Sequence, residues 1–145
     1  VAAAEAADAR LGLAQLLAAE GEVDTAGDLV SEALSMVEAM DGDDHPRVGL
    51  VLVASADVHA RRTLLAARGK ASGDGGGLLY AEGFLRKALS LLGGAQAASS
   101  PSGPPPRQHR QPFAVAALRY SAVLGAQGGR RGAEAEAWAG RAAGV

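Results

Sequence analysis

Apolar positions along this chain recur every three or four residues in successive stretches, which is the spacing of a helix with one buried face. The pattern predicts helices at about 4–20, 24–40, 46–66, 78–93, 112–127 and 132–143. Most of the apolar residues are Ala, Leu and Val, and aromatic residues make up only 3% of the chain. Small, helix-favouring side chains suit close packing of helix against helix, so we predict an all-α fold.

Three segments share the same order of apolar and small residues, and each reads as two helices joined by a turn. The small residue near the middle of each first helix is Ala14, Ala56 or Ala122. The first two are 42 residues apart and the last two 66, which is 24 more. The excess falls in a Gly-rich tract at 68–77 and a Pro/Ser-rich tract at 94–111, and such tracts are typical of flexible insertions. We therefore expect a single domain 1–145 made of three repeats, at about 4–40, 46–93 and 112–143.

The predicted helix ends agree with this division. Gly21 supplies a turn after the first helix, where a positive φ is often required. Pro46 and Pro112 each fit the start of a first helix, where the missing N–H costs nothing. His45, beside Pro46, is expected to cap that helix or to lie on the surface.

These residues resemble the tetratricopeptide repeat, in particular the 42-residue variety seen in kinesin light chains. The matching motifs are His45-Pro46, Ala81-Glu82 with Arg86, and Ala135-Glu136 with Arg141. Leu17, His59 and Gly125 stand where the family prefers tyrosine, so the repeats are degenerate. The resemblance implies a right-handed α-solenoid of three antiparallel helical hairpins, a TPR-like scaffold with no catalytic residue. Its concave surface, lined by the first helices, would bind a peptide or another protein.

The repeat register predicts which side chains line that groove. They are Asp8, Leu11 and Gln15 in the first unit, Leu50, Val53, Asp57 and Arg61 in the second, and Arg119, Tyr120, Val123 and Gln127 in the third. Tyr and Arg are enriched at binding hot spots, and apolar residues in an open groove favour a ligand. A second hypothesis is that the last helix docks on a partner subunit through Trp138. The chain would then be an accessory subunit of a larger, organellar or cytoplasmic, complex.

The sequence does not support catalysis, a metal site or a cofactor. Cysteine is absent, and no two of His45, His59 and His109 have the spacing of a helical metal site. A packing role is expected for His59. The Gly-rich tract lacks the G-x-x-x-x-G-K-[ST] order of a phosphate-binding loop, because Leu64 precedes Gly69 by five residues and Ala71 follows Lys70.

Charge is unevenly distributed along the chain. Residues 1–60 carry twelve acidic residues against Arg10 and Arg47, a net charge of −10, and the remainder carries four against twelve basic residues, or +8. A polarised rod of this kind can steer partners or stack head to tail, and the alternative is two solvated faces of opposite sign. An RNA-binding helical repeat is a disfavoured alternative, because the bases lack interleaved aromatics and the acidic half would repel phosphate.

The location of the protein is only coarsely indicated. No apolar run approaches the roughly 20 residues needed to span a bilayer, so we expect a soluble, intracellular protein. Cytoplasm, mitochondrion and plastid remain open. The chain begins at Val1 rather than Met, which is expected of a processed form or a fragment.

Overall fold

A computed structural model of the chain describes residues 2–66, 68, 76–106 and 108–145. Its long helices are α1 (Ala2–Ala19), α2 (Val23–Asp41), α3 (Pro46–Ala66), α4 (Gly76–Gly93), α6 (Arg110–Gln127) and α7 (Gly132–Ala143). The short helix α5 (Ala95–Ala98) follows α4, and the 3₁₀ turn η1 (Gly129–Arg131) precedes α7. The described residues form no strand, so the predicted all-α class is confirmed.

Every long helix begins and ends within two residues of its predicted bounds. The apolar period sets these positions, because each helix must keep its buried stripe against a neighbour. The elements that the sequence did not predict are α5 and η1, which are four and three residues long. Helices of this length are too short to show a period.

Local hydrogen bonding explains the helix ends. Gly21 has a φ of 93°, and its N–H donates to the Ala18 carbonyl, which closes the last turn of α1. At α3, the Arg47 N–H donates to His45 Nδ1 at 3.1 Å, so His45 caps this helix as expected. Pro112 does not open α6, since the helix begins two residues earlier at Arg110. The proline still lies within the first turn, where its lack of an N–H is tolerated.

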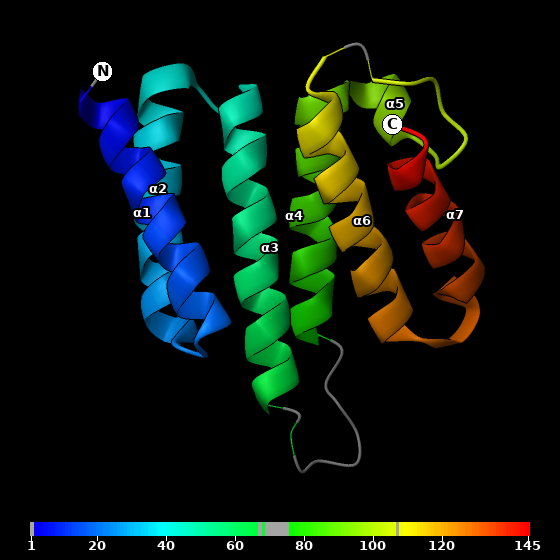
Figure 1. Cartoon of the computed structure of the whole chain (residues 1–145), viewed down its shortest axis with the longest axis horizontal. Coiled ribbons are helices and arrows are strands. Elements are labelled where there is room, and N and C mark those ends of the chain that lie inside the picture. Colours follow the sequence, from blue (N-terminus) through cyan, green and yellow to red (C-terminus); the bar gives the residue numbers. More distant parts are fainter. Residues whose placement is uncertain (1, 67, 69–75, 107) are drawn as a thin grey trace.

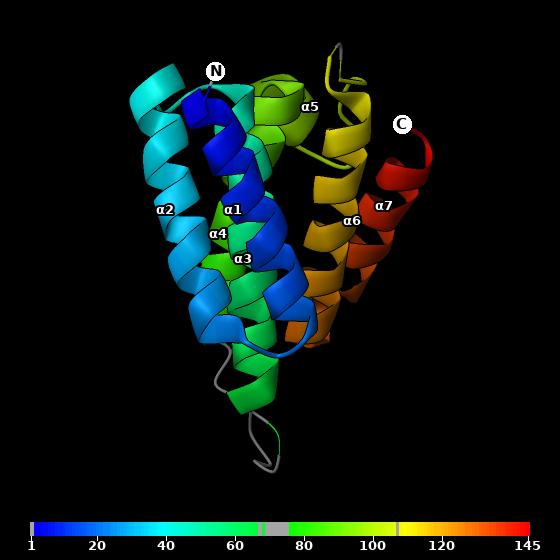
Figure 2. The same ribbon diagram turned by 60° about the vertical axis from the view of Figure 1, so that its left-hand side comes forward.

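Successive long helices run in opposite directions, so that α1 packs against α2, α3 against α4, and α6 against α7 (Figure 1). In addition, α3 contacts both α1 and α2, and α6 contacts both α3 and α4. The pair α1 and α2 and the pair α6 and α7 therefore lie at opposite ends of the long axis, which is also visible from a second direction (Figure 2).

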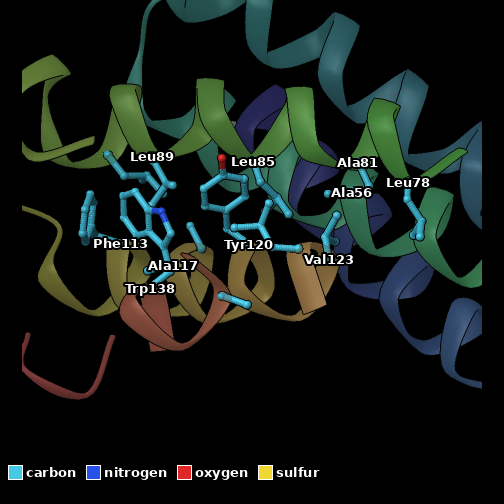
Figure 3. Close-up of a cluster of buried hydrophobic side chains, with 14 of the residues drawn as sticks. Ala56, Leu78, Ala81, Leu85, Leu89, Phe113, Ala117, Tyr120, Val123 and Trp138 are labelled. Atoms are coloured by element: carbon cyan, nitrogen blue, oxygen red, sulfur yellow. The ribbon is translucent and has the colours of Figure 1, made fainter. Parts of the chain in front are cut away.

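The buried residues form two clusters with different compositions. The cluster of α1, α2 and α3 is built mainly of Ala and Val, and Ala14, Ala26 and Ala33 are all fully buried in it. Such short side chains let the helix backbones approach closely. The cluster of α4, α6 and α7 holds the large side chains, including Leu85, Phe113, Tyr120 and Trp138 (Figure 3). The second half of the molecule therefore carries most of the bulky core.

The Pro/Ser-rich tract packs onto this second cluster, which corrects the expectation that it is a flexible insertion. Ala97 and Pro106 are buried, and Arg141 of α7 donates hydrogen bonds to the carbonyls of Ala97 and Pro104. The sequence did not show this because prolines and serines carry little periodic signal. The Gly-rich tract 68–77 lies outside the described residues, apart from Arg68 and the first two residues of α4.

Candidate functional site

Helices α1, α3 and α6 surround a cavity of about 160 Å³. Four residues predicted for the groove line it: Gln15 of α1, Asp57 and Arg61 of α3, and Arg119 of α6. Three apolar residues complete the wall: Ala18, Ala54 and Val58. The fold thus brings together polar side chains that are widely separated in the sequence. We call the surface along α1, α3 and α6 around this cavity the groove.

Asp57 is the electrostatic centre of the cavity. Arg119 Nε lies 3.4 Å from Asp57 Oδ1, and the two side chains are 49% and 32% exposed. Burial raises the pKa of Asp57, while the positive charges of Arg119 and Arg61 act in the opposite direction. Arg61 itself is exposed and makes no ion pair with any described residue. The cavity therefore offers accessible guanidinium donors beside a carboxylate that is incompletely solvated.

A second hollow continues the groove toward the C-terminal ends of α1 and α3. It has a volume of about 380 Å³ and shares Ala18 and Arg61 with the first cavity. Its other lining residues include Leu64, Leu65 and Arg68. These three residues were not predicted for the groove: Arg68 falls in the predicted insertion, and the two leucines lie in the last turn of α3.

The remaining groove candidates of α1 and α3 lie nearer the other end of these helices. Asp8 is exposed and pairs with Arg47 at 3.5 Å, which joins α1 to the start of α3. Leu50 is 41% exposed, whereas Leu11 and Val53 are half-buried against the core. Leu50 is therefore the apolar groove residue that remains most accessible.

Three of the predicted partner contacts are corrected by the structure. Tyr120 and Trp138 are each 3% exposed and Val123 is 6% exposed, so none lies on an open surface. Tyr120 and Val123 face α4 because they belong to the buried stripe of α6. Trp138 packs edge to face on Tyr120, with ring centroids 5.3 Å apart (Figure 3). Trp138 therefore packs in the core of the last helix pair, and it also borders a hollow of about 460 Å³ together with Arg86 and Glu134.

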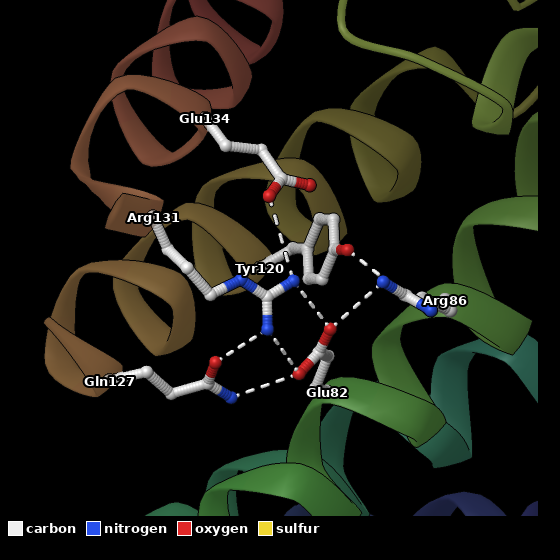
Figure 4. A network of polar contacts seen from close by, with 6 residues as sticks. All are labelled: Glu82, Arg86, Tyr120, Gln127, Arg131 and Glu134. Carbon is white, nitrogen blue, oxygen red and sulfur yellow. Dashed lines mark hydrogen bonds and ion pairs between the residues drawn. The ribbon is translucent and has the colours of Figure 1, made fainter. Parts of the chain in front are cut away.

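Gln127, also predicted for the groove, belongs instead to a polar network around Glu82 (Figure 4). Arg131 donates two hydrogen bonds to the Glu82 carboxylate, at 2.7 and 2.8 Å, and Gln127 Nε2 donates a third at 2.9 Å. Arg86 lies 3.0 Å from the same carboxylate and donates from Nε to the Tyr120 hydroxyl at 3.0 Å. The network ties α4 to α6 and to the start of α7.

The Glu82 network is a structural feature rather than a reactive one. Every polar atom of the carboxylate has a partner, and the hydrogen bonds from Arg131 hold the pKa of Glu82 below its ordinary value. Its side chain is only 8% exposed, so a ligand has little access to it. Sequence alone gave no sign of this arrangement, since Glu82 and Arg131 are 49 residues apart.

The histidines and acidic residues make no metal site in the described part of the chain, where no three candidate ligands cluster. His59 lies between Tyr80 and Phe84, with ring centroids 6.1 and 5.2 Å away, which is the packing role expected for it. Burial, followed by the charge of Arg62, lowers the pKa of His59. Among the described helices, none combines the length and the apolar character needed to cross a membrane.

The candidate site is thus a groove with polar groups at its centre and exposed leucines along α3. No protein-family model, curated protein or solved structure matches this chain.

Proposed function

We propose that the chain is a non-catalytic scaffold that binds a peptide segment or a partner protein in the groove. The observation that carries the proposal is the meeting of Gln15, Asp57, Arg61 and Arg119, from three different helices, around one cavity. In an ion pair with a purely structural role, the N–H donors of the arginine would all be bonded within the protein. Here Arg61 is exposed and Arg119 remains half exposed, so both can still donate to a ligand.

The proposal includes a TPR-like, right-handed solenoid of three helical hairpins. Its support is the order of packing, in which α3 contacts both helices of the first pair and α6 contacts both helices of the second. A stack of hairpins buries a continuous core in this way. In such a stack the first helices, α1, α3 and α6, line the inner surface.

The exposed residues of α3 indicate how a ligand would lie. Leu50 precedes Asp57 by seven residues and Leu64 follows it by seven, which is close to two full helical turns each. The three residues therefore share one side of α3. Leu50 is 41% and Leu64 56% exposed, which leaves an apolar contact on either side of the polar cavity. An extended segment along α3 would bury both leucines and place a polar side chain between them.

The proposal is tested by selecting peptides from a random displayed library on the immobilised chain and measuring their affinities by fluorescence anisotropy. Arg61→Ala and Arg119→Ala should each weaken a selected peptide by about tenfold or more, because each removes a charged donor from the centre of the groove. The matched control is Lys87→Ala, which removes an exposed positive charge from α4, away from the cavity. This variant should bind as the unmodified chain does.

Two results would contradict the proposal. One is a set of selected peptides whose affinities are the same in both arginine variants. The other is equal loss of affinity in Lys87→Ala, since this would show a non-specific attraction to positive charge rather than a shaped site.

A further inference from the structure

Within the residues that the structure describes, the first and last helix pairs each leave one side without a neighbouring helix. The middle pair contacts helices on both sides, because α3 packs against α1 and α2 while α4 packs against α6. The outer sides of the α1–α2 pair and of the α6–α7 pair lie at opposite ends of the long axis (Figures 1 and 2). These two surfaces are separate from the groove.

The free side of the first pair carries exposed apolar residues beside the Arg10–Glu32 ion pair, whose side chains are 39% and 58% exposed. Leu13 is 48% exposed and lies two residues, about 200° around α1, from Gln15, which faces α3. On α2, Gly27 faces Arg62 and Val58 of α3. Met36 and Met40 follow Gly27 by nine and thirteen residues, so each points to roughly the opposite side of α2 from Gly27. Met40 is 38% exposed. We call Leu13, Met40 and the half-buried Met36, which also packs against the core, the N-terminal face.

The free side of the last pair carries an exposed leucine among small residues. Leu118 is 53% exposed and lies two residues from Tyr120, which is buried toward α4. Ala122, two residues beyond Tyr120, shares this side and is also exposed. On α7, Glu136 lies two residues from the buried Trp138 and points to the outside in the same way. We call Leu118, Ala122 and Glu136 the C-terminal face.

The two helix pairs that carry these faces have opposite charge. Residues 2–41 hold nine acidic residues against Arg10, a net charge of −8. Residues 110–145 hold five arginines against Glu134 and Glu136, a net charge of +3, with Arg119 paired to Asp57 and Arg131 to Glu82. Opposite charges attract the two ends of different molecules, whereas two N-terminal faces repel each other. The attraction between the oppositely charged helix pairs therefore favours one occupant for each face, which is the opposite end of another copy.

We propose that the N-terminal face of one copy docks on the C-terminal face of a second copy, so that the chain associates head to tail. Leu13 and Leu118 supply the apolar contact, and the small residues around Leu118 let the helices approach closely. Because the N-terminal and C-terminal faces differ, each added copy leaves one face free to bind the next copy. The contact does not close on itself and the assemblies grow with concentration.

Sedimentation velocity on the full chain tests this association. At low salt the weight-average mass should rise continuously with protein concentration, and high salt should weaken it because the attraction between the ends is screened. Leu13→Glu and Leu118→Glu should each weaken self-association by about tenfold or more, since each places a charge in the apolar contact. Met40→Glu repeats the test on α2 in case Leu13→Glu disturbs folding. The matched control is Leu79→Glu, at a leucine of α4 that is 61% exposed, and it should leave the mass unchanged.

A mixture of Leu13→Glu and Leu118→Glu tests whether the contact joins the N-terminal face of one copy to the C-terminal face of another. Leu13→Glu keeps an intact C-terminal face and Leu118→Glu keeps an intact N-terminal face. A mixture should therefore form one-to-one complexes that do not grow further. Glu136→Lys should strengthen association, because the acidic side chain on the C-terminal face opposes an acidic partner.

A mass that stays at that of the monomer over the whole concentration range would overturn the proposal. So would a mass that levels off at the dimer, or a mixture of the two blocked variants that remains monomeric. Because the faces do not include Arg61, the variant Arg61→Ala should self-associate normally. Loss of peptide binding in that variant and loss of self-association in Leu13→Glu are therefore distinguishable.

Discussion

Arg131 holds Glu82 in a two-pronged contact, with its Nη1 and Nη2 atoms 2.8 and 2.7 Å from the two carboxylate oxygens. The pair joins the first turns of α4 to the start of α7, across α6. Arg131 also lies 3.5 Å from Glu134, so one guanidinium contacts both Glu82 and the first turn of α7. Two parallel hydrogen bonds to a carboxylate fix its orientation as well as its charge. This contact therefore positions the last helix pair on the preceding one.

Removal of Arg131 should destabilise the protein. Arg131→Ala leaves a carboxylate that is 8% exposed with only Gln127 and Arg86 as partners. We expect the free energy of unfolding to fall by about 2 kcal/mol, since one side of a largely buried charged pair is lost. Urea denaturation measures this, and Lys87→Ala, an exposed cation on α4, should change stability by less than about 0.5 kcal/mol.

Stability should also fall in mild acid because of Glu82. The folded protein holds the pKa of this carboxyl below its ordinary value of 4.5, so the unfolded chain takes up the proton first as the pH is lowered. The stabilisation is fully present above 4.5 and is lost as the pH falls through the folded-state value. Glu82→Gln removes this titration. Urea midpoints measured from neutral pH to below 4.5 should therefore fall less steeply for Glu82→Gln than for the unmodified chain.

Trp138 should behave as a core residue. It is the single tryptophan of the chain and is 3% exposed, so its fluorescence should be blue-shifted in the folded state and shift to the red on unfolding. Trp138→Ala should lower the free energy of unfolding by about 3–5 kcal/mol, because it leaves a large cavity against Tyr120. Trp138→Phe should lower it by clearly less. Red-shifted emission from the native protein would contradict the burial of this side chain.

The sequence predicted the helices well because the apolar residues of each helix recur with the helical period. Ala14 and Leu89 fit this period in the sequence, and both are buried in the structure. The sequence placed Gln15, Asp57, Arg61 and Arg119 together through the repeat register, and they do line one cavity. It failed at Tyr120, Val123 and Trp138 because a register gives only the approximate direction of a side chain. A rotation of α6 of about one residue turns a groove position into a core position. The Glu82–Arg131 pair depends on tertiary contacts between distant segments, and these have no periodic signal.

Two glycines of α4 should respond in opposite ways to the same substitution. A Cβ at Gly93 would overlap the ring of Phe113, which is fully buried. Gly93→Ala should therefore lower the free energy of unfolding by about 1–3 kcal/mol, the cost of overpacking a filled core. At Gly83 a Cβ meets no atom within 4 Å, and the position is exposed in the interior of the helix. Gly83→Ala should raise the free energy of unfolding by about 0.5–1 kcal/mol, because alanine favours the helix.

Denaturation of both variants beside the unmodified chain compares an interior position of α4 with the last residue of the same helix. The double change Gly93→Ala with Phe113→Leu then identifies the cause. If the overlap with the ring is responsible, Gly93→Ala should cost less in the Phe113→Leu background than in the unmodified chain, because the shorter side chain leaves room for the new methyl group. An equal cost in both backgrounds would instead place the strain in the helix backbone and would contradict the close packing of α4 on α6 at this point.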